Sequence, residues 1–559
     1  MTVVARIVVS LSVVTGLSLL ATPSDAATSS AQVTWASPMD LPLGVTYNST
    51  VRDVATVAVG GSSIALTFSN LWSATPTTFG AVTVGVEQSG PTVVPGTFVP
   101  VTFANGSRSV TIPANGRVTS DPVPMVVRAN ERLAVTIVVT GQATVSVHYC
   151  CTGRIDSWAT SDGAGDHSTD PTGQSFNPSL TDGFIRWLSG ITVEHSSARG
   201  SIAAFGASIT DGYGYENAGF SWVDALQRRI DQLPAPQRMS VINEGIAGNT
   251  LTVFPPHTSF EGNSGGLPGV TRLATDALAW PGVKDVVVLL GTNDIWFGAG
   301  GLTGKPIPPY GTAASIEAGL RSIAAQTRAH HLNVYAVTLL PRATSTTEDH
   351  DLPEYWGPAE QSVMSSVNSW LLSGDTGFTG VINLAAVMGD VYNGDCLPNS
   401  PFEPYFNPDH LHPNATGETV MANAISTQLF GLSAAPLNPS TVSAVPTPGC
   451  APARVAAALL SAATPTTTTT SSVPPTTSAP TTTTTLPAPA ASNRLRSVLF
   501  SVLLGLVVLA LILAVILRRR VVKRRRQRRN ALRGPTHPWA PQGKPGGGDT
   551  SPRTKPPRR

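Results

Sequence analysis

The residue in this chain whose position most suggests chemistry is Ser208, which follows an apolar run. Ile202–Phe205 has the composition of a buried strand, Gly206 comes next, and Ser208 lies two residues further on. A strand that stops at Gly-x-Ser can present a serine hydroxyl at the carboxyl end of a parallel sheet, where α/β proteins place their sites. A serine alone is a weak nucleophile. The rest of the chain must therefore supply a base, a group that orients it and donors for an oxyanion.

A candidate base and its orienting carboxylate occur in residues 407–413, Asn-Pro-Asp-His-Leu-His-Pro. In Asp-x-x-His, the carboxylate of Asp409 can accept a hydrogen bond from imidazole Nδ1 of His412, which leaves Nε2 to take the serine proton. His412 is better placed than His410 because it directly precedes Pro413, where a helix can start. Two other interpretations are a loop with a helix cap, and a metal site of Asp409, His410 and His412. The metal site is less favoured because no second acidic cluster lies nearby in the sequence.

Two more loops follow strand-like runs and contain suitable oxyanion donors. Gly248 lies in the loop after the run 240–243, and glycine lets a backbone N–H approach a substrate closely. Asn293 lies in Gly-Thr-Asn-Asp after the run 285–290, and its side-chain amide is a natural donor to an oxyanion. Taken singly, each loop is better explained as a turn with Asx caps.

These loops can meet only at the edge of a parallel sheet, and the pattern from residue 199 onward predicts one. Strand-like and helical segments alternate, which is typical of a parallel sheet covered on both faces. Five strands predict an α/β fold, a three-layer flavodoxin-like sandwich. The expected strands are 202–205, 240–243, 285–290, 334–340 and 380–384, and the expected helices are 221–233, 270–279, 314–330, 360–373 and 414–429.

Residues 31–198 are expected to form a separate all-β domain. Short runs rich in Val, Thr and Phe alternate with turn signals such as Gly60-Gly61 and Asn105-Gly106. Strands this short and regularly spaced predict a sandwich or jelly roll. Residues 152–182, rich in Gly, Ser, Asp and Thr, are expected to be a loop.

The four segments 206–212, 243–250, 291–294 and 409–413 together resemble the SGNH, or GDSL, hydrolase superfamily in order, spacing and position. The resemblance covers about residues 199–432. It implies a three-layer hydrolase domain that acts on carboxylic esters. The β domain is similar to the one that precedes this domain in a group of secreted bacterial esterases, a weaker match at residues 35–38 and 166–167.

By this resemblance Ser208 is the nucleophile, His412 the general base and Asp409 the residue that orients it. The Ser208 N–H, the Gly248 N–H and the Asn293 side chain would form the oxyanion hole. The family usually has Asp where this chain has Ala207, a departure that bears on site rigidity and substrate preference. No nucleotide-binding loop or metal-ligand spacing in the sequence supports a cofactor.

The two ends of the chain carry targeting signals. Residues 1–26 read as a signal peptide, with an apolar core and small residues at Ser24 and Ala26. Residues 433–496 are rich in Pro, Thr and Ala and are expected to be a disordered stalk. Residues 497–517 are 21 uncharged residues, enough for one transmembrane helix. The basic run from Arg518 then places the tail, residues 518–559, in the cytoplasm.

Charge and cysteine content limit the classes of function. Residues 518–559 hold 15 of the 36 Lys and Arg and one of the 34 Asp and Glu, so residues 1–517 carry a net charge of −12. An acidic folded part argues against nucleic-acid binding. The four cysteines, Cys150, Cys151, Cys396 and Cys450, suit an exported protein with up to two disulfides, and the sequence leaves three pairings open.

These features predict an extracellular, membrane-tethered serine esterase that acts through an acyl-enzyme on an acylated glycan, glycolipid or lipid. One alternative is an inactive surface protein that binds glycans. Such a protein should have lost at least one of the site residues, and all are present. The other alternative is an acyltransferase that passes the same acyl group to a sugar hydroxyl.

Overall fold

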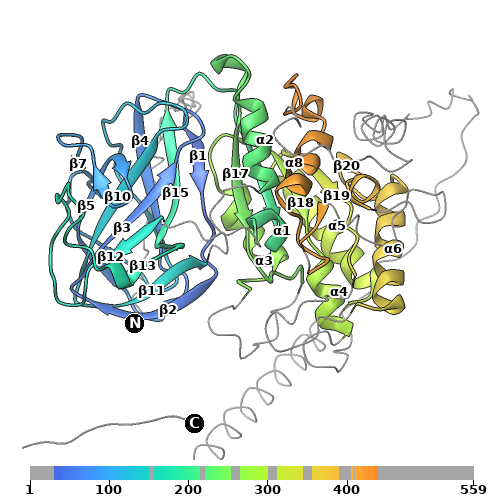
Figure 1. Cartoon of the computed structure of the whole chain (residues 1–559), viewed down its shortest axis with the longest axis horizontal. Coiled ribbons are helices and arrows are strands. Elements are labelled where there is room, and N and C mark those ends of the chain that lie inside the picture. The colour runs from blue at the N-terminus through green and yellow to red at the C-terminus, as the bar shows by residue number, and fades with distance from the viewer. Residues whose placement is uncertain are drawn as a thin grey trace, which may run out of the picture. The chain divides into compact units, whose positions relative to one another are not determined.

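The computed structural model describes residues 31–149, 156–213, 221–252, 265–299, 311–343, 356–389, 405–407 and 409–437 (Figure 1). Within them, an N-terminal all-β region precedes an α/β region. The predicted signal peptide, stalk, transmembrane span and tail, and all four cysteines, lie outside the described residues. No helix in the described part of the chain is long and apolar enough to span a membrane.

The β region consists of antiparallel strands whose apolar faces form a small cluster around Trp158 and one large core. Phe68 and Phe79 meet edge to face in it, with ring centroids 5.5 Å apart, and Trp187 is fully buried. The first sheet has the order β1 (Gln32–Ala36), β15 (Leu188–Glu194), β4 (Ser63–Ser69) and β9 (Arg117–Thr119). The second has the order β13 (Thr181–Asp182), β12 (Ser157–Ala159), β3 (Thr50–Thr56), β10 (Arg132–Thr140), β5 (Thr77–Ser89) and β6 (Thr92–Val93), with β7 (Val99–Pro100) and β8 (Val110–Ile112) also paired to β5. The third has the order β14 (Phe184–Arg186), β11 (Gln142–Tyr149) and β2 (Leu41–Tyr47).

The expectation of a loop over residues 152–182 is wrong in part. Strand β12 lies inside this range and pairs with β3, through Ser157 opposite Asp53 and Ala159 opposite Val51. The Ser157 hydroxyl also donates to the Asp53 carboxylate at 2.5 Å. A three-residue strand of this kind is stabilised by a partner that lies about one hundred residues away, so its local sequence carries little signal.

The α/β region is built on a five-stranded parallel sheet, as the alternating pattern predicts. Among the described strands the order is β17 (Ser240–Gly245), β16 (Ser201–Gly206), β18 (Val283–Leu289), β19 (Asn333–Val337) and β20 (Gly380–Ile382). All four pairings are parallel. Since β16, the first strand of the α/β region, lies second in the sheet, the strand order reverses beside it. Sites in open α/β sheets form at such reversals, beyond the carboxyl ends of the strands.

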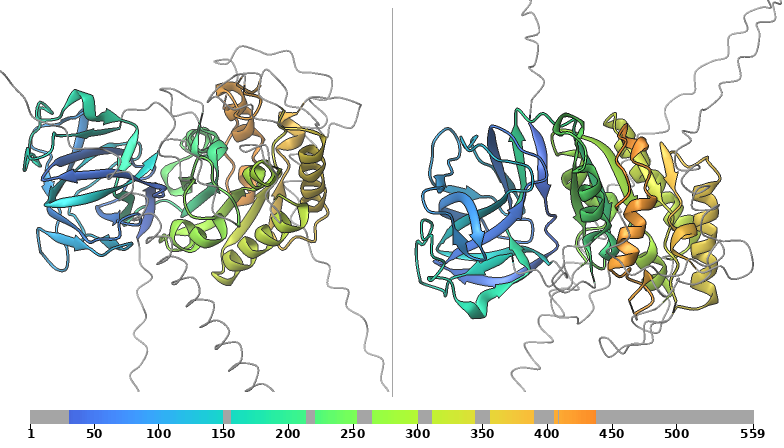
Figure 2. Two further views of the ribbon diagram at one scale, coloured as in Figure 1. Left: turned by 90° about the horizontal axis from the view of Figure 1, so that it is seen from below. Right: turned by 45° about the horizontal axis from the view of Figure 1, so that its top comes forward.

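Helices cover both faces of this sheet, which gives the three layers (Figures 1 and 2). One face packs on α2 (Trp222–Ile230), α7 (Ala385–Met388) and α8 (Ala415–Ala424). The other packs on α3 (Gly269–Leu273), α4 (Thr292–Ala299), α5 (Ala313–Ala329) and α6 (Pro358–Leu372). Capping residues fix several helix starts, since Ser221, Thr312 and Asn414 each accept a backbone N–H of the first turn.

Three helices differ from the sequence expectation. The expected helix 270–279 is α3 followed by a π-helical turn, η3 (Ala274–Leu278). The expected helix 414–429 is α8 and a separate 3-10 turn, η5 (Thr427–Phe430). The Gly-Thr-Asn-Asp segment, expected as a loop, begins helix α4, because Gly291 at φ +127° turns the chain directly from strand into helix.

The two regions are joined along strand β1. Val33 and Ala36 on β1 belong to the same apolar cluster as Ala203 and Phe205 on β16. The hydroxyls of Ser201 and Ser240, at the starts of β16 and β17, both donate to the Val33 carbonyl, at 2.8 and 2.6 Å. The β region therefore packs against the edge of the parallel sheet that carries Ser208.

Candidate active site

Ser208 lies where the sheet order reverses, at the first residue of the short helix α1 (Ser208–Asp211), directly beyond β16. The turn requires glycine at 206, because a Cβ there would lie 2.0 Å from the Thr210 hydroxyl and 3.0 Å from the Leu289 carbonyl. Ser208 is 8% exposed, so its hydroxyl is nearly surrounded by protein. The strand-turn arrangement expected from Gly-x-Ser is therefore present.

The structure brings Ser208, His412 and Asp409 together in line. His412 Nε2 lies 2.9 Å from Ser208 Oγ, and His412 Nδ1 lies 2.5 Å from Asp409 Oδ2. With the proton on Nδ1, the ring donates to Asp409 and leaves Nε2 to accept from the serine. The His412 ring also packs against the Tyr213 ring, with centroids 4.5 Å apart.

Asp409 is held as an ionised acceptor. Its Oδ1 accepts the backbone N–H groups of Leu411 and His412, both at 3.0 Å. Burial acts to raise the pKa of Asp409, but these bonds and the contact with the His412 ring outweigh burial and lower it to about 2. Asp409 can therefore keep the ring orientated and stabilise the imidazolium that forms when His412 takes a proton.

The expected oxyanion donors lie around the same point. Asn293, in the first turn of α4, lines a small and mostly apolar hollow together with Ser208, Ala207 and Leu411. Its amide donates one hydrogen to the Asn249 carbonyl at 2.9 Å, which leaves a second hydrogen for an oxyanion. Ala207 thus forms part of the wall beside the nucleophile.

Gly248 lies in the loop after β17, with φ +74°, a conformation that favours glycine. Two buried carboxylates hold this loop. Asp211 Oδ2 accepts the Ala247 N–H at 3.1 Å, one residue before Gly248. Asp294 Oδ2 accepts the Leu251 N–H at 2.8 Å, three residues after it. Burial raises the pKa of Asp294 to about 7, although the hydrogen bonds from Leu251 and Thr252 act in the opposite direction.

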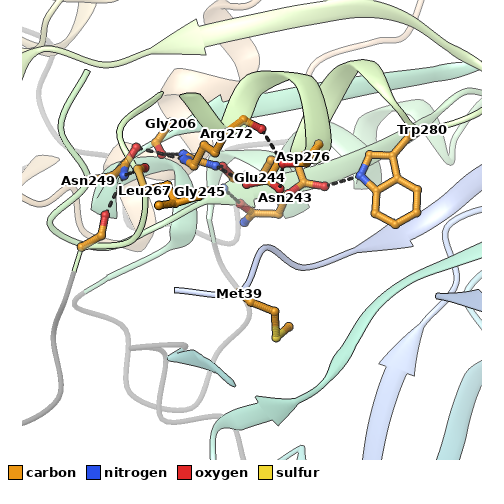
Figure 3. A network of polar contacts seen from close by, with 12 residues as sticks. Met39, Gly206, Asn243, Glu244, Gly245, Asn249, Leu267, Arg272, Asp276 and Trp280 are labelled. Carbon is orange, nitrogen blue, oxygen red and sulfur yellow. Dashed lines mark hydrogen bonds and ion pairs between the residues drawn. The ribbon is translucent and has the colours of Figure 1, made fainter. Parts of the chain in front are cut away.

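Arg272, the fourth residue of α3, is fully buried and ties the strand ends beneath this loop (Figure 3). Its guanidinium donates to the Gly206 carbonyl at 2.8 Å, the Glu244 carbonyl at 2.9 Å and Asn249 Oδ1 at 3.1 Å. The same group forms an ion pair with Asp276 at 3.3 Å. The guanidinium of Arg272 therefore fixes the backbone at Gly206, just before the nucleophile, and the side chain of Asn249, just after Gly248.

Glu244 lies on the far side of this network, toward the β region (Figure 3). It is fully buried and accepts the Trp280 indole N–H at 2.7 Å. Burial, together with the nearby Asp276 carboxylate, raises the pKa of Glu244 well above its usual range. Trp280 in turn packs on Gly190 of β15, where a Cβ would lie 2.2 Å from the indole ring.

The structure brings together Ser208, Asp409, His412 and Asn293 and places Gly248 in the loop beside them. Sequence reasoning missed the groups that support them. Asp211 and Asp294 lie within the same short segments as Ser208 and Asn293, so the sequence alone could have indicated that they belong to the site. Arg272 is one basic residue in a helical pattern and gives no such signal. Across the described residues, no three His, Cys, Asp or Glu side chains gather as metal ligands would.

Comparisons with known proteins agree on the α/β region. Residues 204–420 match the family model described as the GDSL-like Lipase/Acylhydrolase family. No curated protein matches the chain. Among solved structures, the chain is similar to the aryl esterase of M. smegmatis, with 19% identity over 42% of this chain and 100% of that one, and a TM-score of 0.30.

Two further solved structures are similar to the chain at the same level. A carbohydrate acetylesterase from Sinorhizobium meliloti is 17% identical over 41% of this chain and 98% of that one, with a TM-score of 0.29. A GDSL-like lipase from Bacteroides thetaiotaomicron is 17% identical over 40% of this chain and 84% of that one, with a TM-score of 0.27.

Proposed function

We propose that the chain is an extracellular, membrane-tethered serine esterase acting through an acyl-enzyme, with its catalytic domain in the residues 204–420 that match the GDSL-like Lipase/Acylhydrolase family model. The family match supports an ester as the bond that is hydrolysed. The observation that carries the proposed mechanism is the line Ser208 Oγ, His412, Asp409, with contacts of 2.9 and 2.5 Å. This is the arrangement that general-base activation of a serine requires.

Acylation begins when Ser208 Oγ attacks the ester carbonyl carbon while His412 Nε2 takes the hydroxyl proton. The new C–O bond moves the carbonyl electron pair onto oxygen, where the Ser208 N–H, the Gly248 N–H and the Asn293 amide stabilise it. The intermediate collapses as the bond to the alkoxide breaks and His412 returns the proton to the leaving oxygen. The acyl group is then bound to Ser208.

Deacylation repeats these steps with water. His412 takes a proton from the attacking water, and the oxyanion forms in the same place. Collapse of the second intermediate releases the carboxylic acid and returns the proton to Ser208. A sugar hydroxyl in place of water would give acyl transfer, so product analysis with a sugar acceptor separates hydrolysis from transfer.

The proposed location rests on the sequence. A signal peptide over residues 1–26 would export the chain, and the 21 uncharged residues 497–517 would anchor it. The basic residues that follow would keep the tail in the cytoplasm and the esterase outside. In this arrangement the substrates are acyl or acetyl esters of glycans, glycolipids or lipids at the cell surface.

The test is Ser208→Ala in the full chain, assayed with p-nitrophenyl acetate. We expect turnover to fall to background, a loss on the order of 10⁶-fold in kcat when a serine nucleophile is removed. Ser366→Ala is the matched control, because that serine is exposed on α6 and bonds only to the Ser362 carbonyl. Control-like turnover in Ser208→Ala would contradict the proposed function.

A further inference from the structure

One side chain of the β region contacts Asp211, whose carboxylate holds the loop after β17 that contains Gly248. This loop is called the oxyanion loop. His148 lies on β11, and its Nε2 is 3.2 Å from Asp211 Oδ1 on α1. The two side chains are 8% and 2% exposed, so the contact is almost fully removed from water. A buried hydrogen bond to a carboxylate contributes more than one at the surface, because leaving that carboxylate without a donor costs its desolvation free energy.

Asp211 connects this histidine to both parts of the site. It is the last residue of α1, three positions after Ser208, and its backbone N–H donates to the Ala207 carbonyl at 2.9 Å. Its second carboxylate oxygen accepts the Ala247 N–H at 3.1 Å. The carboxylate of Asp211 therefore spans from His148 on one side to the peptide next to Gly248 on the other.

The backbone of Asp211 packs directly against the end of β17. A Cβ on Gly245 would lie 2.2 Å from the Asp211 backbone nitrogen, so α1 and the start of the loop are in direct backbone contact. The Asn243 amide also donates to the Asp211 carbonyl at 3.2 Å. A rotation of the Asp211 carboxylate would thus release the Ala247 N–H and alter the direction of the neighbouring Gly248 N–H.

We propose that His148 is a positioning residue of the esterase site, which sets the oxyanion loop through Asp211. This inference rests on the proposed function, since it assigns Gly248 its role as an oxyanion donor. With the proton on Nε2, His148 donates to Asp211 Oδ1 and keeps Oδ2 directed at Ala247. The β region is then part of the catalytic machinery rather than an independent module.

The buried His148–Asp211 contact adjoins a space that is open to solvent. His148 and Asp211 both line an open cavity of about 240 Å³ between the β and α/β regions, with Trp35 on its wall. Imidazole is small enough to enter a cavity of this size. A His148→Gly variant therefore leaves space in which added imidazole can restore the donor to Asp211.

The experiment measures kcat and KM for p-nitrophenyl acetate in full-length His148→Leu, His148→Gln, His148→Gly and Asp211→Asn. Rates are divided by the concentration of sites that react with a fluorophosphonate. We expect kcat of His148→Leu to fall about tenfold with KM within twofold, an effect in the range that coupled residues produce. His148→Gln, whose amide can donate to Asp211, should keep most of the activity, and imidazole should raise kcat of His148→Gly severalfold.

His167→Leu is the matched control in the same region, because the described hydrogen bond of the His167 ring is a surface contact with the Ala164 carbonyl of its own loop. It should leave kcat unchanged. If His148→Leu does not fold, Asp211→Asn takes its place, with the same expected loss of kcat per titrated site. Unchanged kcat in these variants, or a loss that neither glutamine nor imidazole restores, overturns the proposal. If one of these two outcomes is found while Ser208→Ala is inactive, the role of His148 is wrong but the proposed esterase function is not. If Ser208→Ala is active, the proposed function itself is wrong.

Discussion

Arg52 in the β region and Arg272 in the α/β region are both fully buried, and both donate to backbone carbonyls and pack on aromatic rings. Arg52 bonds to the Thr136 hydroxyl and to the carbonyls of Pro91 and Asp170, which belong to loops of the β region. Arg272 bonds to the ends of the strands that carry the candidate site.

The difference between the two arginines shows how the two regions use burial. In the β region a buried cation holds loops together and has no described contact with the site. In the α/β region the same kind of group sets the positions of residues that would contact substrate. His148, which contacts Asp211, and Arg117, which pairs with Asp276 at 3.7 Å, are β-region side chains that cross this division. Variants in which kcat and stability are measured separately test this difference between the two regions.

The largest effect is expected at the donor that faces the substrate. Asn293→Ala removes the side-chain hydrogen bond to the oxyanion, so kcat for p-nitrophenyl acetate should fall on the order of 10²–10³-fold. The thermal midpoint should change little, because the amide makes one described bond within the protein, to the Asn249 carbonyl. A kcat within threefold of the wild-type value would exclude Asn293 from the oxyanion hole.

The next effect compares the two buried arginines. Arg272→Met leaves Asp276 without its buried cation and frees three acceptors, so the free energy of unfolding should fall by about 3–5 kcal/mol. The kcat per titrated site should fall too, because the Gly206 and Asn249 contacts are lost. Arg52→Met should cost about 1–3 kcal/mol in the free energy of unfolding and leave kcat per titrated site unchanged.

Denaturant unfolding together with kcat per titrated site measures both quantities. A loss of kcat in Arg52→Met, or an unchanged kcat in a folded Arg272→Met, would contradict the roles assigned to the two arginines, stability alone for Arg52 and stability together with activity for Arg272.

The last comparison concerns the pH dependence of stability. The folded-state pKa of Asp294, raised to about 7, lies above its unfolded value, so its contribution to stability is lost as pH rises from about 4 to 7. Asp170 in the β region has the opposite shift. Burial acts to raise its pKa, but hydrogen bonds from Thr172 and Ser175 lower it to about 2, so its contribution is lost as pH falls from about 4 to 2.

We therefore expect the thermal midpoint of the wild type relative to each variant to change with pH in opposite directions for Asp294→Asn and Asp170→Asn. The thermal midpoint of the wild type minus that of Asp294→Asn should decrease between pH 4 and pH 7. The corresponding difference for Asp170→Asn should increase between pH 2 and pH 4. A difference that does not change with pH in either variant would contradict the shift assigned to that carboxylate.

The sequence predicts the parts of the fold and site that depend on local patterns. Alternating apolar strands and helices predict the five parallel strands, because burial on both faces leaves continuous apolar runs. Asp-x-x-His before a proline predicts which histidine meets Ser208, since the three-residue spacing lets one loop orient its own ring. The strand ends then bring Asn293 to the same edge of the sheet.

The remaining features depend on contacts between distant residues. Strand β12 forms because β3 pairs with it, and helix α4 starts early because Gly291 adopts a conformation that its neighbours do not reveal. His148 and Asp211 are 63 residues apart and belong to different regions. Arg272 finds its carbonyl partners only after three loops have come together. Tertiary packing decides each of these, and no local pattern encodes it.

The most direct test of the central claim is the site of covalent labelling by a fluorophosphonate, read by peptide mass spectrometry of the full chain. We expect one adduct, on Ser208, that is lost when His412 is replaced by alanine, because the hydroxyl then has no base. An adduct on another residue, or unreactive Ser208 in a folded and active protein, would contradict it.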